Sequence, residues 1–180
     1  MITAKILLAY LLHSVSIAGL PVDTTQIDPQ EVYCMAENIY YEARNEDIRG
    51  QFAVASVTLN RTKDARFPST VCGVVQQSAR SKITDRLVCA FSWYCENDKK
   101  GREIPVRNKD GSVNQHVVDQ FQVASIIAIT VLSGDVKDNT HGATYFHNPF
   151  TSHPSWRNEF IKTMRIGNHD FYKTPPLKAE

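Results

Sequence analysis

Apolar residues recur at helical spacing in the first part of the chain that follows its N-terminal hydrophobic stretch. Asp28 is a typical N-cap, Pro29 suits the first helical position and Glu31 occupies the capping-box position. Apolar residues then follow at spacings of three and four, which predicts a helix with one buried stripe. The residues of this stripe are Val32, Met35, Ile39 and Ala43.

The same spacing predicts two longer helices further on. One starts at Asp47 and runs to about Arg61, after a turn at residues 44–46. The other follows Asn114, ends at Ser133-Gly134 and has few polar residues in its second half, so we expect it to be the central, most buried helix. The predicted inner face of the first of these helices is Ile48, Phe52, Ala55 and Leu59, and that of the second is Val117, Val118, Phe121, Ala124, Ile127, Ala128, Val131 and Leu132.

The remaining segments are shorter and less regular. After the loop KDARFPST, residues 71–77 predict a short apolar helix, and LVCAFSWYC (87–95) is strand-like. The polar run at residues 97–112 predicts a surface loop without packing demands. The last third of the chain, with GATYFHNPF, SHPSW and KTMRIGNHDFY, alternates turn residues with aromatic and β-branched ones. The pattern therefore predicts a mostly helical α+β fold with a small β-sheet.

The N-terminus has the layout of a secretory signal, with one lysine, an apolar run and then small residues. We expect a signal peptide at residues 1–18, with an uncleaved anchor as the alternative, and a linker at residues 19–27. A single folded domain is expected at residues 28–173 and a tail at residues 174–180. The mature protein would then act in the periplasm, the cell wall or the extracellular space, without stable membrane association.

Charge argues against a nucleic-acid partner. The chain has 20 Lys and Arg against 19 Asp and Glu, and removing Lys5 with the signal leaves the two signs equal. A chain without net charge or a basic run lacks the electrostatic footprint of a nucleic-acid-binding protein. We expect a monomer.

The four cysteines all follow the predicted signal, and an even number in an exported chain indicates two disulfides. Three pairings are possible, and we favour a local bridge between Cys89 and Cys95 with a longer one between Cys34 and Cys72. A zinc site built on cysteines needs a close CxxC pair, which is absent from the sequence. No metal and no cofactor are predicted.

The stretch YYEARNED places Glu42 between aromatic and apolar residues near a predicted helix end. A carboxylate there is either a surface charge or helix-end ion pair, or an acid in a prepared environment. Desolvation and the negative end of the helix dipole would both raise its pKa, whereas direct pairing with Arg44 would lower it.

Several motifs resemble one family. IYYEARNEDIRGQFAVASVTLNR, DARFPSTVCGVVQQ, CAFSW, VLSG, GATYFHN and IGNHDFY together resemble the spore cortex-lytic (SleB/CwlJ-type) cell wall hydrolases, from about Ala36 to Tyr172. The resemblance implies a lysozyme-like fold, peptidoglycan glycan strands as substrate and lytic transglycosylase activity, with Glu42 as the catalytic acid. The family often has Gly where this chain has Asn45, and His where it has Tyr145.

Glycosidic bond cleavage independently requires an acid that is still protonated near neutral pH. Glu46 is more suited to stabilising the turn than to acting as a second carboxylate, because Asn45 and Asp47 interrupt the helix. A nucleophile from the substrate, the muramoyl 6-hydroxyl, is then the favoured partner of Glu42. The alternatives are a muramidase-type hydrolase on the same site, a non-catalytic peptidoglycan-binding module, or a zinc amidase that uses histidines from the set His141, His147, His153 and His169.

Aromatic and polar residues in the same motifs are candidates for binding sugars, because aromatic faces pack on pyranose rings. Alternation along a strand would place Phe91 and Trp93 on one side and Ser92 on the other. The predicted substrate-binding residues are Tyr41, Glu46, Ser92, Trp93, Tyr145 and His147.

Overall fold

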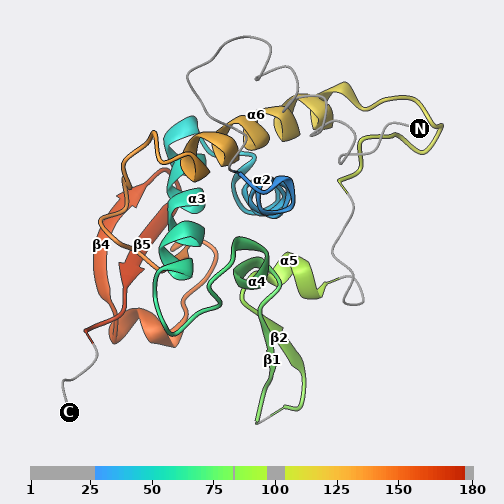
Figure 1. Ribbon diagram of the computed structural model, residues 1–180. Helices are drawn as coiled ribbons and strands as arrows, with labels where there is room; N and C mark the ends of the chain where they lie inside the picture. Colours follow the sequence, from blue (N-terminus) through green and yellow to red (C-terminus); the bar gives the residue numbers. More distant parts are fainter. Residues whose placement is uncertain (1–26, 83, 97–103, 177–180) are drawn as a thin grey trace.

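Helix α3 (Ile48–Thr62) lies at the centre of the fold in a computed structural model that describes residues 27–82, 84–96 and 104–176 (Figure 1). On one side α3 packs against α2 (Pro29–Ala43), α4 (Val71–Val75) and α6 (Gln115–Leu132). On its other side it packs against the C-terminal sheet. The predicted signal and most of the linker and tail lie outside the described residues.

The C-terminal sheet has the strand order β3-β5-β4 and is antiparallel throughout. Its strands are β3 (Tyr145–His147), β4 (Ile161–Ile166) and β5 (His169–Lys173). The middle strand β5 is buried except at its last residue. Phe171 at its centre packs with Ala53 and Val57 of α3 in a small second core. The predicted mostly helical α+β fold with a small sheet is confirmed.

The predicted N-cap Asp28 is confirmed, and the helices predicted to start at Asp47 and after Asn114 are capped by those residues. The Asp28 side chain accepts a hydrogen bond from the Gln30 N–H at 2.8 Å, and the Asp47 side chain accepts one from the Gly50 N–H at 2.7 Å. Asn114 likewise caps α6. Each supplies an oxygen to a backbone donor that the first helical turn leaves unpaired.

Glu31 does not complete the predicted capping box. Its carboxylate instead accepts hydrogen bonds from the Val71 N–H at 2.6 Å and the Cys72 N–H at 3.2 Å, at the start of α4. The sequence could not show this contact, because it joins residues about 40 positions apart. Glu31 therefore ties α4 to α2 and satisfies donors that a helix start leaves free.

The predicted inner face of α3 is wrong in part. Ile48 is 52% exposed, whereas Gln51, Ser56 and Arg61 are buried. Because α3 is covered by helices on one side and by the sheet on the other, nearly its whole circumference faces protein. A single-stripe pattern describes a helix with one buried side, which α3 is not.

Helix α6 is not the most buried helix. It lies along one edge of the helical layer, and Ile126 on its outer side is 50% exposed (Figure 1). By length and composition alone α6 could cross a membrane, but half of it is buried inside the fold. Its apolar inner side packs on α2 and α3, so α6 serves as a core helix.

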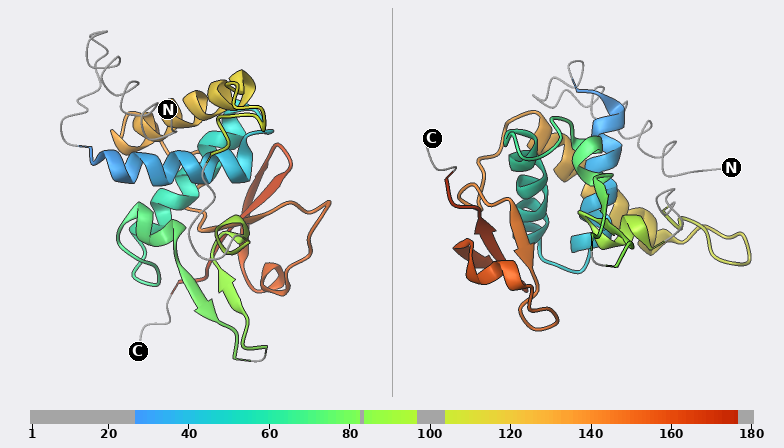
Figure 2. Two further views of the ribbon diagram at one scale, coloured as in Figure 1. Left: turned by 90° about the vertical axis from the view of Figure 1, so that its right-hand side faces the viewer. Right: turned by 90° about the horizontal axis from the view of Figure 1, so that it is seen from below.

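Residues 78–106 differ from the prediction in two ways. β1 (Ser78–Arg80) and β2 (Leu87–Cys89) form a hairpin that projects from the helical layer (Figure 2), but the strand ends there and Ser92–Cys95 forms the short helix α5. Ile104 and Val106 are buried in the main core, so the polar run around them carries packing that its composition concealed.

Both predicted disulfides are confirmed. Cys34 of α2 bonds to Cys72 of α4, and Cys89, the last residue of β2, bonds to Cys95 at the end of α5. The four cysteines are all used, and none is free. Both bridges lie in the helical part of the molecule and neither reaches the C-terminal sheet.

Candidate active site

Glu42 lies in the last turn of α2 and is only partly exposed. Burial raises the pKa of this carboxyl from 4.5 to about 7, against the opposing positive charge of Arg61 and with a further contribution from the negative charge of Glu96. Among the described residues no ion pair joins Glu42 to a cation. Glu42 is therefore a carboxyl that remains substantially protonated near neutral pH.

Arg44 does not neutralise Glu42, although it is only two residues away. Its guanidinium lies 4.9 Å from the centre of the Tyr40 ring and donates a hydrogen bond to the Tyr40 carbonyl oxygen at 3.2 Å. The side chain thus covers the end of α2, where carbonyl groups lack helical partners. The pairing that would have lowered the pKa of Glu42 is replaced by this contact.

Asn38 holds the helices around Glu42 in place. Its side-chain amide donates to the Thr58 hydroxyl of α3 at 3.0 Å, and its amide oxygen accepts from the Trp93 indole N–H of α5 at 3.1 Å. The Trp93 ring stacks on Tyr41 with 4.5 Å between ring centres. Asn38 is one helical turn before Glu42, so this junction fixes the walls beside the acid.

Arg61 brings a positive charge close to the site from α3. It is 5% exposed, and its Nε donates to the Thr144 carbonyl oxygen at 2.7 Å. The guanidinium lies 4.9 to 5.4 Å from the centres of three rings, those of Phe67, Phe91 and Tyr145. Burial lowers the pKa of Arg61 to about 10, which leaves it charged at neutral pH.

Glu46 is engaged in holding the turn between β4 and β5. Its two carboxylate oxygens accept hydrogen bonds from the Asn168 N–H and the Asn168 side-chain amide, both at 3.0 Å. The preceding Gly167 has a positive φ of 55°, and a Cβ there would collide with Glu46. Glu46 thus clamps this hairpin turn to the start of α3.

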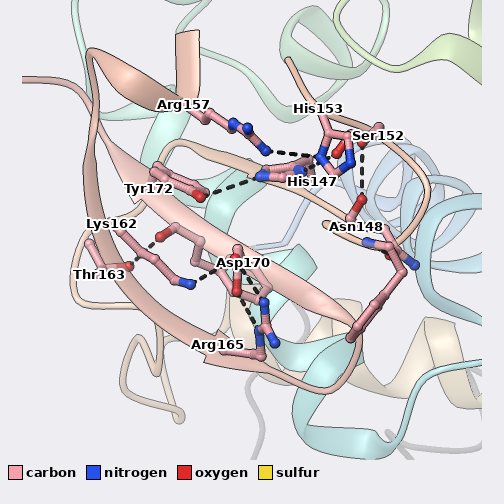
Figure 3. Close-up of polar contacts among 12 residues, drawn as sticks. His147, Asn148, Ser152, His153, Arg157, Lys162, Thr163, Arg165, Asp170 and Tyr172 are labelled. Atoms are coloured by element: carbon pink, nitrogen blue, oxygen red, sulfur yellow. Dashed lines mark hydrogen bonds and ion pairs between the residues drawn. The ribbon is translucent and has the colours of Figure 1, made fainter. Parts of the chain in front are cut away.

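Tyr145 and His147 lie on the same side of β3 and contact a group of aromatic residues. The Tyr145 ring is 4.6 Å from that of Phe160 and 5.3 Å from that of Trp156. In Figure 3 the His147 ring bridges the Ser152 carbonyl oxygen at 3.0 Å and the Tyr172 hydroxyl at 3.3 Å. A carbonyl only accepts, so Nδ1 of His147 carries the proton of that bond.

Comparison with known proteins places this site in a family. The profile of the Cell Wall Hydrolase family matches residues 45–172. The chain belongs to the cell wall hydrolase family. The matched segment contains Arg61 and Tyr145, and Glu42 lies just before it.

Relatives of this chain include spore cortex-lytic enzymes. That of Halalkalibacterium halodurans is 30% identical over 142 residues, which are 78% of this chain and 34% of the relative. That of Oceanobacillus iheyensis is 31% identical over 144 residues, 79% of this chain and 41% of the relative. The chain therefore spans about a third to two fifths of the length of these relatives.

Solved structures show the same fold. One is the catalytic domain of the germination-specific lytic transglycosylase SleB from Bacillus anthracis, with a TM-score of 0.55 and 26% sequence identity. The alignment covers 83% of this chain and 98% of the SleB chain. The catalytic domain of the Bacillus cereus SleB protein has a TM-score of 0.56 and 27% identity over 86% of this chain.

The predicted sugar-binding residues occupy different environments in the structure. Tyr41 and Tyr145 are partly exposed near Glu42 and Arg61, Ser92 is exposed, and Trp93 and His147 are buried with their ring nitrogens hydrogen bonded. Binding of substrate by these six residues, Glu46 included, stays a prediction. The sequence analysis missed Arg61 and Glu96, because both lie at helix ends among polar residues, where a charged side chain is ordinarily exposed.

The four histidines that a zinc amidase would use have different environments. His147 and His169 are buried, His153 contacts Arg157, and His141 lies in a turn with a positive φ of 58°. In the described parts of the chain, no group of three or more His, Cys, Asp or Glu side chains is arranged to hold a metal ion. No observation on these residues favours the amidase.

Proposed function

We propose that this chain cuts the glycan strands of peptidoglycan at the MurNAc-GlcNAc β-1,4 bond as a lytic transglycosylase. One observation carries the proposal: Glu42 is a shielded carboxyl with a pKa of about 7, as an acid for glycosidic cleavage requires. The SleB domain that shares its fold is named a lytic transglycosylase, which supports the same chemistry.

Glu42 acts twice in this mechanism. First it gives its proton to the glycosidic oxygen while the bond to the muramoyl C1 breaks and the ring becomes oxocarbenium-like. The Glu42 carboxylate then takes the proton of the muramoyl 6-hydroxyl as that oxygen bonds to C1. The product end is a 1,6-anhydroMurNAc ring, Glu42 is again protonated and no water is consumed.

The hydrogen bonds that Glu46 already makes support a mechanism in which the nucleophile comes from the substrate. A retaining or inverting hydrolase needs a second carboxylate that is free to attack or to activate water. Both Glu46 oxygens already accept hydrogen bonds from Asn168. A reaction with one acid and an internal hydroxyl therefore fits the residues around Glu42 better than one that uses Glu46.

A muramidase-type hydrolase is the second candidate, and Glu96 is the observation that favours it. This exposed residue at the end of α5 is close enough for its charge to raise the pKa of Glu42. A carboxylate facing the acid across a glycan strand could activate water. In that reaction Glu96 would be as indispensable as Glu42.

Mass spectrometry of muropeptides after complete digestion of peptidoglycan tests the two candidates. The transglycosylase gives anhydro ends, and the hydrolase gives reducing ends heavier by about 18 mass units, the mass of the added water. Glu96→Gln keeps making anhydro ends in the first case and makes no product in the second. Intact glycan with released stem peptides, and activity lost to EDTA and restored by zinc, would replace both candidates with the amidase.

We also propose that the protein is exported and acts on peptidoglycan as a monomer, outside the reducing cytoplasm. Two disulfides that use every cysteine fit an oxidising compartment. Thiol titration of the unfolded protein, purified from its native compartment, should find no free thiol. Four free thiols would contradict export.

A further inference from the structure

Arg61 carries a buried positive charge and has no role in the mechanism proposed above. It is 5% exposed, and its Nε is satisfied by the Thr144 carbonyl oxygen. Its Nη1 is also buried but has no hydrogen-bond acceptor among the described residues. A buried charged donor without an acceptor is unfavourable for folding alone, and such groups are concentrated at functional sites.

Glu42 and Arg61 lie on the facing sides of α2 and α3. The side chains of Asn38 and Thr58 are joined by a hydrogen bond of 3.0 Å, which marks the facing sides of α2 and α3. Glu42 follows Asn38 by four positions and Arg61 follows Thr58 by three, so each lies on the same side of its helix as the bonded residue. The two charges therefore come from the facing sides of neighbouring helices.

Aromatic rings hold the Arg61 guanidinium at a fixed place. Phe67 precedes α4, Phe91 precedes α5 and Tyr145 belongs to β3, and each ring centre is within 5.4 Å of the guanidinium carbon. Rings around a cation attract it and exclude water. A charge held without water acts more strongly on its neighbours than the same charge in solvent.

Building on the proposed function, we propose that Arg61 is a positioning residue for Glu42: its buried charge stabilises the carboxylate that remains after Glu42 has protonated the leaving sugar. Arg61 gives up no proton and forms no bond to the substrate. The proton of Glu42 passes to the glycosidic oxygen and is later replaced by the proton of the muramoyl 6-hydroxyl. Arg61 makes the intermediate state of this cycle, with Glu42 ionised, more favourable.

Other charged and titratable groups near Glu42 and Arg61 come from α5, β3 and α2. Glu96 at the end of α5 opposes Arg61, and the Tyr145 phenol of β3 interacts with Arg61 itself. Arg44 on α2 is turned onto Tyr40. Arg61 is the cation that favours the ionised form of Glu42 in this set.

The test is the pH dependence of kcat/KM with solubilised glycan strands, for the wild type, Arg61→Met, Arg61→Lys and the control Arg44→Met. Activity that needs protonated Glu42 falls as pH rises through its pKa of about 7. Loss of the Arg61 charge raises that pKa, so Arg61→Met should move the fall in activity to higher pH by about one unit. At pH 5, where Glu42 is protonated in both proteins, its kcat should be lower by about tenfold.

Arg61→Lys keeps the charge but loses the planar fork, so its activity should fall with pH where the wild type does. Arg44→Met should leave the profile unchanged. A residue that only supports the fold would lower the melting temperature and leave the pH of the fall in place. If Arg61→Met does not fold, Arg61→Gln replaces it, because Gln keeps a donor for the Thr144 oxygen.

Each outcome of these measurements supports or overturns the inference. A profile of Arg61→Met or Arg61→Gln that coincides with the wild type overturns the inference, and so does misfolding of both variants, which would make Arg61 a residue needed for the fold. An Arg61→Lys profile displaced like that of Arg61→Met overturns it as well, because lysine keeps the positive charge. The proposed function fails separately, when Glu42→Gln retains more than a tenth of wild-type turnover.

Discussion

Two shielded carboxyl groups, Glu42 in the helical part and Asp170 in the C-terminal sheet, have pKa values shifted in opposite directions. Burial raises the pKa of Glu42 to about 7. Hydrogen bonds from Arg165 and Lys162 lower the pKa of Asp170 to about 2, although Asp170 is only 4% exposed. Burial alone therefore does not decide whether a carboxyl is ionised.

The difference comes from the donors that each region supplies. Asp170 receives Nε and Nη2 of Arg165 at 2.6 and 3.1 Å and Nζ of Lys162 at 2.7 Å, as Figure 3 shows. The cation nearest in effect to Glu42 is Arg61, which forms no ion pair with it among the described residues. A carboxylate surrounded by donors is suited to holding strands together, and one without them is suited to giving up a proton.

The two regions are also held together differently. Both disulfides join parts of the helical region, whereas the sheet relies on its ladder and on the Asp170 ion pairs. Reducing agents should therefore act on the surroundings of Glu42, and strong acid on the sheet.

Glu42→Gln should have the largest effect. Gln keeps the size and polarity of Glu42 but has no proton to transfer, so turnover should fall by about 10² to 10⁴. The matched control is Glu46→Gln, the same change four residues away, which should lose less because Glu46 binds Asn168. Initial rates on purified glycan strands measure both; a Glu42→Gln protein with more than a tenth of normal activity contradicts the assignment.

Removing the disulfides should come next in size. In the chain-entropy account, replacing Cys34 and Cys72 with Ser, which opens a separation of 38 residues, lowers the free energy of unfolding by about 4 kcal/mol. Opening the Cys89-Cys95 bridge, with a separation of 6, costs about 2 kcal/mol. Urea unfolding of both double variants measures this, and the reverse order would show that local strain or denatured-state structure outweighs loop length.

Glu42→Gln should also make the protein more stable at pH 8. The folded pKa of Glu42 is raised, so the wild type loses stability as pH rises from 4.5 through about 7, when the unfolded chain ionises first. The variant avoids this loss and should gain about 2 to 3 kcal/mol at pH 8 and nothing at pH 4. Equal stabilities at both pH values would mean that Glu42 is not desolvated in solution.

Asp170→Asn should show the opposite dependence and the smallest effect. The folded pKa of Asp170 is lowered, so its contribution is present above pH 3.8 and is lost as pH falls through about 2. Because Lys162 and Arg165 are half exposed, we expect a loss of about 1 to 2 kcal/mol at pH 7 with kcat unchanged. Thermal unfolding between pH 2 and 7 tests this; a loss that persists at pH 2 would indicate packing damage.

Local signals made the helix starts predictable. Asp28, Asp47 and Asn114 each cap a helix that the pattern predicted. Such starts can be predicted because a cap involves residues only two or three positions apart. The surroundings of these helices were not predictable to the same degree. Ile48 is exposed, and Glu31 binds α4, because both outcomes depend on elements that meet only in the folded chain.

The candidate site was predictable in its acid but not in its neighbours. Glu42 stood out through its motif and its apolar surroundings. Arg61 and Glu96 did not, since they reach Glu42 from α3 and from the end of α5. Trp93 was expected beside the substrate on the pattern of a strand, but residues 92–95 form a helical turn that buries its ring against Asn38.

The most direct test is the titration of Glu42 itself, by carbon-13 NMR of its carboxyl in the wild-type protein without substrate, with Glu42→Gln to assign the signal. The account predicts a midpoint of about pH 7, coinciding with the fall of kcat/KM toward alkaline pH. A midpoint below 5, near that of an ordinary glutamate, would leave Glu42 ionised at neutral pH. It would then have no proton to give, and the one-acid mechanism would be contradicted.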